Sequence, residues 1–581
     1  MEKTGAEILV EGLLVEGVTH LFGITGSPLL PILDVVYRTP QIRFVQSQNE
    51  QFAMFMTNGY ARAARRTGVC MVTRGPGATN AMTGVALAYY NAIPSLLIAA
   101  EEGDLFHGLE TSLFHNIEGS VLFKPVTKLA RRVERADRIP ESLQTAFRLA
   151  ATGRRGPVYL GIPRQITKEK ACVQFDPPER SRIQCLPCGN PREISKAAEL
   201  LAGARNPVAL VGGGLAWADA QDVLLQIAEL LAMPVGASRG NKGIIPETHP
   251  LALGVISHGG AAYTIDTFQE SDLVLAVGTT FEEFTVDRFG YRVIPRGGKM
   301  IHIDLDPAEI GKIYPVDVGI MGDARSVLEQ ILKELRQIKT VRAPYGESGR
   351  VKKLLQRKKQ WQEEISHLMH SDKTPIQRGR LMHDLHQALP KDALVSGTSG
   401  STHQWFEYAY PATVHTTQIG GWGPMGAEYC EALGAQLALP DKRVVCIMGD
   451  GAAMMSLQEL QTAVTYNIPV LCVVCHNNLF GNIHYSQIKR FGSRFIGTNI
   501  NVPNLADVAR VFGAYGERVV DPGQIIPAVY RALDSGKPAL LDVMIDTSPE
   551  NLAPPGSFTE AATDAKRQAD VSLSARKASS Q

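Results

Sequence analysis

The chain has 581 residues, a formal net charge of +1 and an ordinary globular composition, 44% hydrophobic and 20% charged. A length of this kind predicts three or four domains. The balanced charge provides no field to attract nucleic acid or an anionic membrane, and no apolar run approaches the roughly 18 residues that a spanning helix needs. The N-terminus carries acids within its apolar pattern, unlike a secretory signal. We expect a cytoplasmic protein whose eight cysteines are reduced.

The first part of the chain alternates expected strands and helices. Thr4-Gly5-Ala6-Glu7 fits a capping box, which predicts a helix to about Glu16. Further strands are expected at 20–24, 42–47, 69–73, 95–100 and 158–162, and helices at 29–36, 50–65 and 78–89. Alternation at this spacing indicates a parallel α/β domain, which we place at 1–170.

A second α/β domain is expected at 190–340, after a linker that contains Pro and Cys and lacks periodicity. Its clearest strands are expected at 207–211, 272–277 and 299–303. Gly212-Gly213-Gly214 follows the first of these strands but does not fit G-x-G-x-x-G. A turn that needs backbone freedom is therefore preferred to a dinucleotide site.

Residues 341–373 are rich in Lys, Arg, Gln and Glu and are interpreted as a solvated helical linker. Acids follow the basic residues at once, which argues against a nucleic-acid patch. A third α/β domain is expected at 374–550, and 551–581 is expected to be a flexible tail whose first part could fold over a site. The predicted fold class is thus α/β, with three doubly wound parallel-sheet domains.

The most informative stretch is the strand–turn–helix–strand pattern at 443–482. The expected strand at 444–448 is broken by Gly449-Asp450-Gly451, and a capping box at Ser456-x-x-Glu459 predicts that the helix begins there. Asn477 follows the second strand, expected at 470–475. In a parallel sheet Asp450 and Asn477 then lie at the same edge, where ligands bind.

These residue types suit a metal–phosphate pair. Mg²⁺ takes about six oxygens and usually one or two of them from protein carboxylates, and the backbone N–H groups near Gly451 would face a phosphate. The alternative is a strand-end turn followed by a structural asparagine. The whole pattern of Gly-Asp-Gly followed by Asn477-Asn478 resembles the thiamine diphosphate (ThDP) binding motif.

The resemblance implies that Asp450, Asn477 and the carbonyl of Leu479 hold Mg²⁺ on the diphosphate of the cofactor. His476 stands where many relatives have Asn. Cofactor contacts are implied for the neighbouring positions Gly449, Gly451, Ala452, Phe480 and Gly481.

The segment that begins at Glu50 (E-Q-x-A, then G-Y-A-R) resembles the one that carries the catalytic Glu of ThDP enzymes. It implies that Glu50 bonds N1′ of the pyrimidine and favours the imino tautomer, which removes the proton from thiazolium C2. This chemistry needs a carboxyl in an apolar pocket. Without the resemblance, Glu50 would be an ordinary carboxylate in the first turn of a helix.

Three further segments resemble parts of the same family. GGWGPMG at 420–426 implies that Met425 is wedged between the two cofactor rings, although gap-filling core is the alternative. The loop at 397–402 resembles one that binds the diphosphate, and RGPGATN at 74–80 resembles a turn near the pyrimidine. The implied cofactor-binding residues are Gly26, Gly75, Pro76, Gly400, Ser401, Gly423 and Met425.

The segments KPVTK (124–128) and GPVYLGIPR (156–164) match the acetolactate-synthase-like branch, so the resemblance covers about 1–550. It implies pyrimidine-binding, middle and diphosphate-binding domains in that order. It also implies a ThDP- and Mg²⁺-dependent carboligase or decarboxylase that acts on a small 2-oxo acid through an enamine. The sites would lie at the interface of a homodimer or homotetramer, with a small carbonyl compound as substrate and no nucleic-acid or membrane partner.

Departures from the branch leave alternatives. Phe114-His115-Asn116 stands where synthases have Phe-Gln-Glu, so His115 is a candidate catalytic proton relay or acceptor-side donor, or a surface histidine without a role. The flavin-contacting Arg pattern is poorly matched at 279–288, which disfavours FAD and leaves it open. The Gly26-Ser27 turn also resembles sulfoacetaldehyde acetyltransferases.

Two other protein classes were weighed. A non-catalytic relative that keeps the fold is disfavoured by the intact Glu50 and Gly-Asp-Gly. A nicotinamide dehydrogenase would need G-x-G-x-x-G in its first strand–helix turn, and this chain has none there.

Overall fold

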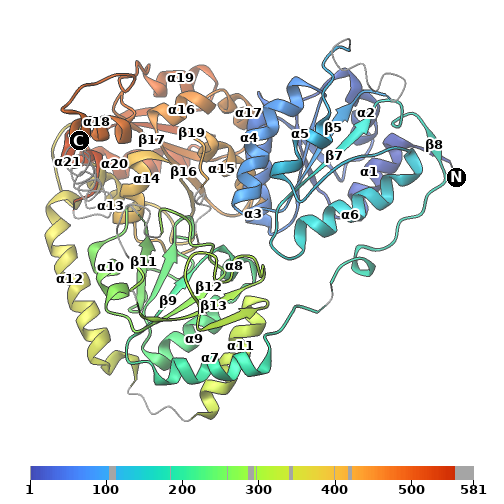
Figure 1. Ribbon diagram of the computed structural model, residues 1–581. Coiled ribbons are helices and arrows are strands. Elements are labelled where there is room, and N and C mark those ends of the chain that lie inside the picture. Colours follow the sequence, from blue (N-terminus) through green and yellow to red (C-terminus); the bar gives the residue numbers. More distant parts are fainter. Residues whose placement is uncertain are drawn as a thin grey trace, which may run out of the picture.

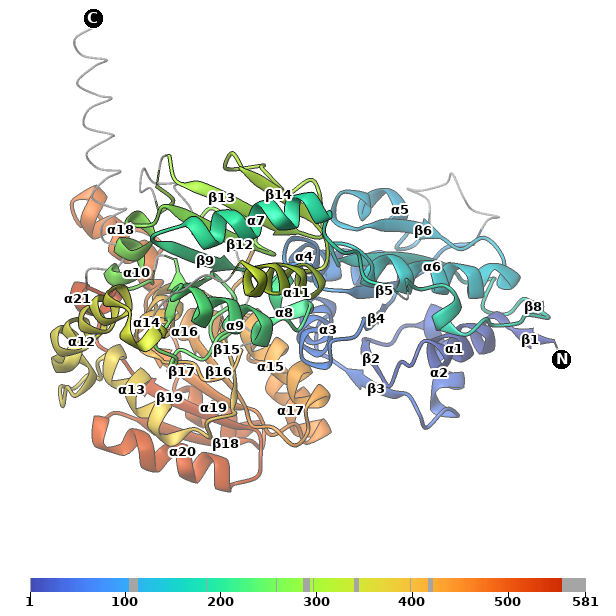
Figure 2. The same cartoon turned by 90° about the horizontal axis from the view of Figure 1, so that it is seen from below.

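The computed structural model describes residues 2–103, 113–183, 185–257, 259–285, 293–295, 297–338, 344–397, 399–415 and 422–555. These residues form three α/β domains around parallel sheets (Figure 1), which confirms the predicted fold class. In Figure 1 the first domain (blue to cyan) and the third (orange to red) lie side by side, and the second (green to yellow) lies beneath them. Figure 2 gives the same grouping from below.

The first domain holds a parallel sheet of order β3-β2-β4-β5-β7-β6, and β1 pairs separately with β8. Its strands are β1 (Lys3–Thr4), β2 (His20–Gly23), β3 (Arg43–Gln46), β4 (Gly68–Val72), β5 (Ser95–Glu101), β6 (Leu129–Arg132), β7 (Pro157–Pro163) and β8 (Lys170–Ala171). Its helices are α1 (Gly5–Val15), α2 (Leu30–Tyr37), α3 (Glu50–Ala64), α4 (Pro76–Tyr90), α5 (Gly119–Leu122) and α6 (Ile139–Ala151).

Local signals located most of these elements. The capping box between Thr4 and Glu7 forms as predicted. The edge strand β6 was not predicted, because its sequence, LARR, has neither an apolar run nor alternation, and all four of its residues are half-buried.

The second domain holds a parallel sheet of order β11-β10-β9-β12-β13-β14. Its strands are β9 (Pro207–Val211), β10 (Val235–Ser238), β11 (Ala252–Ile256), β12 (Leu273–Val277), β13 (Lys299–Asp304) and β14 (Val318–Met321). Its helices are α7 (Pro191–Gly203), α8 (Gly213–Trp217), α9 (Gln221–Leu231), α10 (Ala262–Gln269) and α11 (Ala324–Gln337).

The predicted helical linker is α12 (Gly349–Met369), which runs along one side of the molecule in Figure 1. It is not solvated on all sides. One stripe is buried against the second and third domains, at Val351, Leu354, Ile365 and Met369.

The third domain holds a parallel sheet of order β15-β16-β17-β19-β18. Its strands are β15 (Leu394–Ser396), β16 (Val444–Gly449), β17 (Leu471–His476), β18 (Tyr515–Val519) and β19 (Ala539–Met544). Its helices are α13 (Arg378–Ala388), α14 (Gly400–Ala409), α15 (Ala427–Ala438), α16 (Asp450–Ser456), α17 (Glu459–Tyr466), α18 (Gly481–Phe491), α19 (Leu505–Val511), α20 (Ile525–Asp534) and α21 (Pro549–Leu552).

The prediction that a helix begins at Ser456 was wrong. Helix α16 begins at Asp450, directly after β16, and ends at Ser456, and α17 follows after a short break. The expected capping box does not form. The Ser456 hydroxyl has no hydrogen-bond partner among the described residues, and the Glu459 carboxyl instead accepts a 2.9 Å bond from the backbone N–H of Gln48 in the first domain.

Helix α3 of the first domain packs against helix α15 of the third domain so closely that their backbones are in contact. A Cβ at Gly434 would lie 1.9 Å from the carbonyl oxygen of Met56, and a Cβ at Gly59 would lie 2.0 Å from that of Glu431. Any side chain at these glycines would force the helices apart. Since 59 faces 431 and 56 faces 434, the two helices run antiparallel at this contact.

Among the described residues, no helix is long and apolar enough to cross a membrane. None of the eight cysteines is in a disulfide, and five of them, Cys70, Cys430, Cys446, Cys472 and Cys475, are buried.

Candidate cofactor site

The first half of the candidate site is built around Asp450, at the carboxyl end of β16. Its Oδ1 accepts a 2.8 Å hydrogen bond from the N–H of Gly451, and its Oδ2 accepts one of 2.9 Å from the N–H of Asn477. The N–H of Asn478 donates to the same Oδ2 at 2.5 Å. Burial raises the pKa of Asp450, and these three amides oppose that shift because they stabilise the carboxylate.

Asn477 supplies the second polar group at this edge of the sheet. Its side chain is buried, its Oδ1 accepts a 3.2 Å hydrogen bond from the N–H of Leu479, and its Nδ2 has no partner among the described residues. A buried amide nitrogen without a partner is costly, unless a ligand satisfies it. Hard oxygens, one of them ionised, are the donors that Mg²⁺ prefers. The residues present therefore fit a magnesium diphosphate.

The described residues contain no cluster of three or more His, Cys, Asp or Glu that could hold a metal. The arrangement at Asp450 is of another kind, because it combines one carboxylate with amide and carbonyl oxygens. Such a site relies on phosphate oxygens and water to complete the coordination of the metal.

The other predicted diphosphate contacts gather around this centre. The Ser401 hydroxyl donates a 2.9 Å hydrogen bond to the Asn482 side chain, and a Cβ at Gly481 would lie 2.9 Å from the Ser401 Oγ. Gly400 opens α14 with a φ of +73°, and nothing lies within 4 Å of the place where its Cβ would be. A Cβ at Gly451 would meet the ring of Phe480 at 2.5 Å.

Met425 and Gly423 lie at the N-terminal end of α15, where Gly426 packs on α16. A Cβ at Gly426 would lie 3.0 Å from the Cβ of Met455 and 3.4 Å from the carbonyl of Ala452. The half-buried Met425 is thus next to the helix that starts at Asp450. These residues, with those at 400–401, 449–452 and 477–481, form one half-site on the third domain.

The second half-site lies at the carboxyl edge of the first sheet. Glu50 starts α3, is 8% exposed, and accepts a 3.0 Å hydrogen bond from the side-chain amide of Asn80. A Cβ at Gly77 would lie 3.1 Å from the Glu50 Oε1 and 2.8 Å from Thr73, and a Cβ at Gly26 would lie 2.7 Å from Thr73. The predicted residues Glu50, Gly26, Gly75 and Pro76 are therefore neighbours.

His115 joins this half-site through its backbone. A Cβ at Gly75, which has a φ of +61°, would lie 2.5 Å from the carbonyl oxygen of His115. The His115 ring is exposed and stacks on Phe114 at 3.6 Å between centroids. A catalytic role for this side chain stays a prediction.

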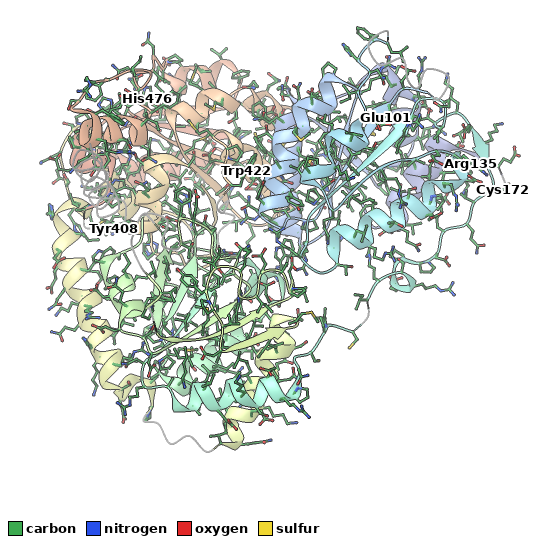
Figure 3. All side chains as sticks on the ribbon, in the orientation of Figure 1. Glu101, Arg135, Cys172, Tyr408, Trp422 and His476 are labelled. Carbon is green, nitrogen blue, oxygen red and sulfur yellow. The ribbon has the colours of Figure 1, made fainter. Side chains whose placement is uncertain are left out.

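The two half-sites of one chain do not meet. Met425 lies beyond the point where α15 crosses Gly59, and Glu50 lies at the opposite end of α3. The part of α3 between Glu50 and Gly59 alone is about 14 Å long at 1.5 Å per residue. Figure 3 shows the neighbouring Trp422 between the first and third domains, where its ring stacks on that of Tyr90 at the far end of α4.

Three family models match the chain in the order of its domains. They are the thiamine pyrophosphate enzyme N-terminal TPP binding domain at 3–113, the central domain at 194–331 and the C-terminal TPP binding domain at 396–543. The chain belongs to the thiamine pyrophosphate enzyme family.

The relatives place this thiamine pyrophosphate enzyme in the acetolactate-synthase-like branch. It is 33% identical over 574 residues to a probable acetolactate synthase large subunit of Methanococcus aeolicus, covering 95% of this chain and 94% of the relative. It is 32% identical to a similarly named protein of Methanocaldococcus jannaschii, with 95% and 94% covered. It is also 32% identical to the acetolactate synthase isozyme 3 large subunit of Escherichia coli (strain K12), with 94% and 95% covered.

These matches confirm the predicted family and branch. The protein is an enzyme that uses thiamine diphosphate on a small-molecule substrate, and it is similar to acetolactate synthases throughout the three domains. These matches do not support a non-catalytic role, which is one of the alternatives to the predicted function.

A buried pair lies close to Asn477 in this thiamine pyrophosphate enzyme. His476 Nδ1 is 2.7 Å from Asp542 Oδ1 on the neighbouring strand β19, and both side chains are buried. Burial lowers the pKa of His476, but the hydrogen bond and charge of Asp542 outweigh it and the net shift is upward. The strand end that carries Asn477 is thereby fixed to β19.

The carboxyl edge of the middle domain carries a charged cluster shared with the third domain. Arg239, just after β10, donates a 3.1 Å hydrogen bond to His403 and its guanidinium lies 4.6 Å from the ring centre of Phe284. His403 Nε2 is 3.0 Å from Glu407 Oε1. The stretch on which the flavin prediction rests, 279–288, extends into 286–292, outside the described residues, so FAD stays an open prediction.

Sequence reasoning missed several residues of the site. Asn80 ends the motif at 74–80, but the motif gives it no role, whereas in the structure its side chain donates a hydrogen bond to Glu50. The buried Arg378 donates a 2.7 Å hydrogen bond from Nη1 to the backbone carbonyl of Asn551. This bond holds the segment of Asn551 against the rest of the third domain. Leu552 lies 3.3 Å from the place of a Cβ at Gly481, so the chain after residue 548 does fold next to the site.

Proposed function

We propose that this enzyme is a Mg²⁺-dependent carboligase or decarboxylase of a small 2-oxo acid, and its similarity to proteins named acetolactate synthase supports a carboligase. The observation that carries the proposal is the hydrogen-bonded unit around Asp450, where three backbone amides hold one carboxylate beside the unpartnered amide of Asn477. Asp450, Asn477 and the Leu479 carbonyl would hold the metal. The amides near Gly451 and the loop at 400–401 would bind the diphosphate.

When bound, ThDP supplies the electron sink that allows the bond next to the carbonyl of a 2-oxo acid to break. The role proposed for this chain is to hold a proton at the correct ring atom. Glu50 is nearly buried, and Asn80 fixes one of its oxygens, so the other is available to the pyrimidine N1′. A carboxyl in such a place can share its proton with a ring nitrogen.

The proposal includes a second copy of the chain. The half-site with Glu50 and the half-site with Met425 lie at opposite ends of α3, so each needs its complement from another subunit. Apolar side chains around the half-site with Met425 are exposed in the single chain, among them Met454, Met455, Ile483, Phe495 and Ile496. We infer a homodimer, or a homotetramer of two such dimers, with two-fold symmetric interfaces.

Two variants test the function. Glu50→Gln should bind ThDP and Mg²⁺ in calorimetry and lose most activity on a panel of short 2-oxo acids, followed by CO₂ release and product mass. Asp450→Ala should lose ThDP binding, and wild-type protein should lose it when Mg²⁺ is chelated. Full turnover by Glu50→Gln, or unchanged ThDP affinity in Asp450→Ala, would refute the assigned roles.

Mixing the two inactive variants tests the shared site. If Glu50 and Asp450 of one site come from different chains, a hybrid dimer has one doubly altered site and one intact site. Random reassociation should then restore about one quarter of the wild-type activity. If both residues served the same site within one chain, every hybrid site would be defective and no activity would return.

A further inference from the structure

One face of α17 contacts the segment that leads into α3, the helix that begins at Glu50. Glu459, Thr462 and Tyr466 recur at the spacing i, i+3, i+7, which places them on one side of a helix. All three contact the backbone or side chains of residues 43–49 in the first domain. That segment comprises the whole of β3 and the three residues between it and Glu50.

The contacts follow the segment step by step. The N–H of Gln46 donates a 2.9 Å hydrogen bond to the Tyr466 hydroxyl, and Arg43 donates one of 3.0 Å to the Tyr466 carbonyl. The N–H of Gln48 donates one of 2.9 Å to Glu459 Oε1. The N–H of Asn49, the N-cap residue of α3, also bonds the Glu459 carboxyl.

Glu459 is buried completely, and each of its oxygens has a partner. The Thr462 hydroxyl donates a 2.7 Å hydrogen bond to Glu459 Oε2, on the side opposite the Gln48 bond. Burial raises the pKa of Glu459 to about 7, while Thr462 and the two amides oppose that shift. Burying a carboxyl is costly unless hydrogen bonds replace those to water, and here two of the replacing bonds come from backbone amides of the first domain.

The local sequence offered this carboxyl another use. In a capping box with Ser456, the Glu459 carboxyl would accept a hydrogen bond from the backbone N–H of Ser456. Instead, α17 begins without a side-chain cap, and Ser456 Oγ has no partner among the described residues. The carboxyl is therefore committed to the backbone of another domain at the expense of its own helix.

We propose that Glu459 is a positioning residue that fixes the first turn of α3, and with it the Glu50 carboxyl, from the third domain. The inference rests on the proposed function of Glu50. Because Glu459 bonds the amides immediately before Glu50, a change there displaces the carboxyl without touching the cofactor-binding residues. A misplacement of about 1 Å at a reacting group can lower a rate by about a hundredfold.

The test compares Glu459→Gln and Glu459→Ala with the control Glu517→Gln. Glu517 lies on the edge strand β18 of the same domain, where it pairs with Arg531, so the control makes the same change of charge away from the segment. Glu459→Gln can still accept the bond from Gln48, whereas Ala cannot. We expect kcat to fall about tenfold in Gln and about a hundredfold in Ala, with ThDP affinity within twofold of wild type.

A second readout needs neither cofactor nor turnover. Native-state hydrogen exchange of the apo protein should show faster exchange in the peptide that covers residues 46–52 in both Glu459 variants, and not in the control. Tyr466→Phe should show a smaller effect confined to Gln46. A variant that fails to fold would show fast exchange throughout the chain. If Glu459→Ala fails in this way, Glu459→Gln is compared with the control instead.

The outcomes separate this inference from the proposed function. Unchanged kcat and unchanged exchange at 46–52 in Glu459→Gln overturn the inference, even where Glu50→Gln is inactive. Lower thermal stability with normal kcat per folded subunit would also overturn it, since Glu459 would then only join the domains. Full activity of Glu50→Gln would overturn the proposed function, and with it the positioning role, whatever the exchange data show.

Discussion

The side-chain amide of Asn80 donates a 3.0 Å hydrogen bond to the carboxyl of Glu50, and so joins the start of α4 to the start of α3. An amide N–H pairs with the carbonyl oxygen of a neutral carboxyl as well as with a carboxylate. It can therefore fix the orientation of Glu50 and leave the other oxygen for the proposed contact with the pyrimidine. The oxygen that accepts this bond is Oε2, so Oε1 is the other oxygen.

Asn80→Ala should lower kcat by about tenfold to a hundredfold, because a hydrogen bond to an ionisable group contributes about 1.5–3 kcal/mol. ThDP affinity should change little, since the proposed diphosphate contacts lie on the third domain. Steady-state kinetics and calorimetry check both values. Thr79→Ala, at the exposed neighbouring position, is the control and should behave as wild type. Wild-type kcat in Asn80→Ala would show that Glu50 is oriented without this bond.

Gly75→Ala should disturb the contact between the 74–77 turn and the segment at 115. Gly75 has a φ of +61°, and its Cβ would lie 2.5 Å from the carbonyl oxygen of His115. The backbone must shift, at a cost of about 1–3 kcal/mol. We expect activity to fall at least tenfold and the thermal midpoint to fall by a few degrees.

Gly153→Ala provides the matched control for that variant. Gly153 also has a positive φ, of +62°, but nothing lies within 4 Å of its Cβ position. It should show the strain of the backbone conformation and no loss of activity. Equal activity losses in both variants would mean that the contact with His115 has no part in the reaction.

The sequence predicted the site best where the residues concerned form short, contiguous motifs. The turn at 449–451 and the pair at 477–478 kept their neighbours in the structure, because each follows a buried strand that was visible as an apolar run. The segment after Glu50 follows the largely exposed β3 and was found by its own motif. The edge strand β6 has no such run and was missed.

The remaining features depend on contacts between distant segments. The capping box at Ser456 failed because Glu459 bonds the backbone of Gln48, more than four hundred positions away in the chain. The separation of the half-sites follows from the backbone contact between Gly59 and Glu431. Neither contact can be predicted from the local sequence, because a glycine or glutamate within a helical pattern does not indicate which distant segment packs against it.

The buried Glu431, on α15, predicts a pH dependence of stability. Both of its oxygens lack hydrogen bonds among the described residues, and Arg62 Nη1 is 3.7 Å away. Burial raises its pKa to about 8, Arg62 opposes the shift and Glu428 adds to it. Between its ordinary pKa of 4.5 and about 8, the folded chain binds a proton that the unfolded chain has lost. Stability from this group is therefore lost as pH rises through that window.

Glu431→Gln removes this titration. Relative to wild type, the variant should gain stability as pH rises from 5.5 to 8.5, by about 3 kcal/mol at about 1.4 kcal/mol per pH unit below the folded pKa. Thermal midpoints of both proteins, at fixed protein concentration and without cofactor, provide the measurement. A change in packing caused by the amide acts equally at every pH, so the slope and not the absolute midpoint decides. Parallel pH profiles would mean that Glu431 is ionised in the folded protein at little cost.

The segment that follows residue 548 should contribute to both stability and cofactor binding. Asn551 accepts a 2.9 Å bond at Oδ1 from the N–H of the buried Arg378, and its carbonyl accepts bonds from the Arg378 guanidinium and from Trp405 Nε1. Asn551→Ala leaves one buried N–H without an acceptor and should cost about 1–3 kcal/mol. Glu550→Ala, at an exposed neighbouring position, should cost nothing measurable.

Truncation after Ser548 should have a larger effect, because it also removes the Asn551 carbonyl and the Leu552 side chain beside Gly481. Gly481 is a proposed neighbour of the diphosphate, so ThDP affinity should fall in the truncated protein and stay near wild type in Asn551→Ala. Denaturant unfolding and calorimetry measure the two effects separately. If truncation lowers stability but leaves ThDP affinity intact, the segment supports α14 and α18 without reaching the cofactor, and Gly481 would lose its place in the diphosphate site.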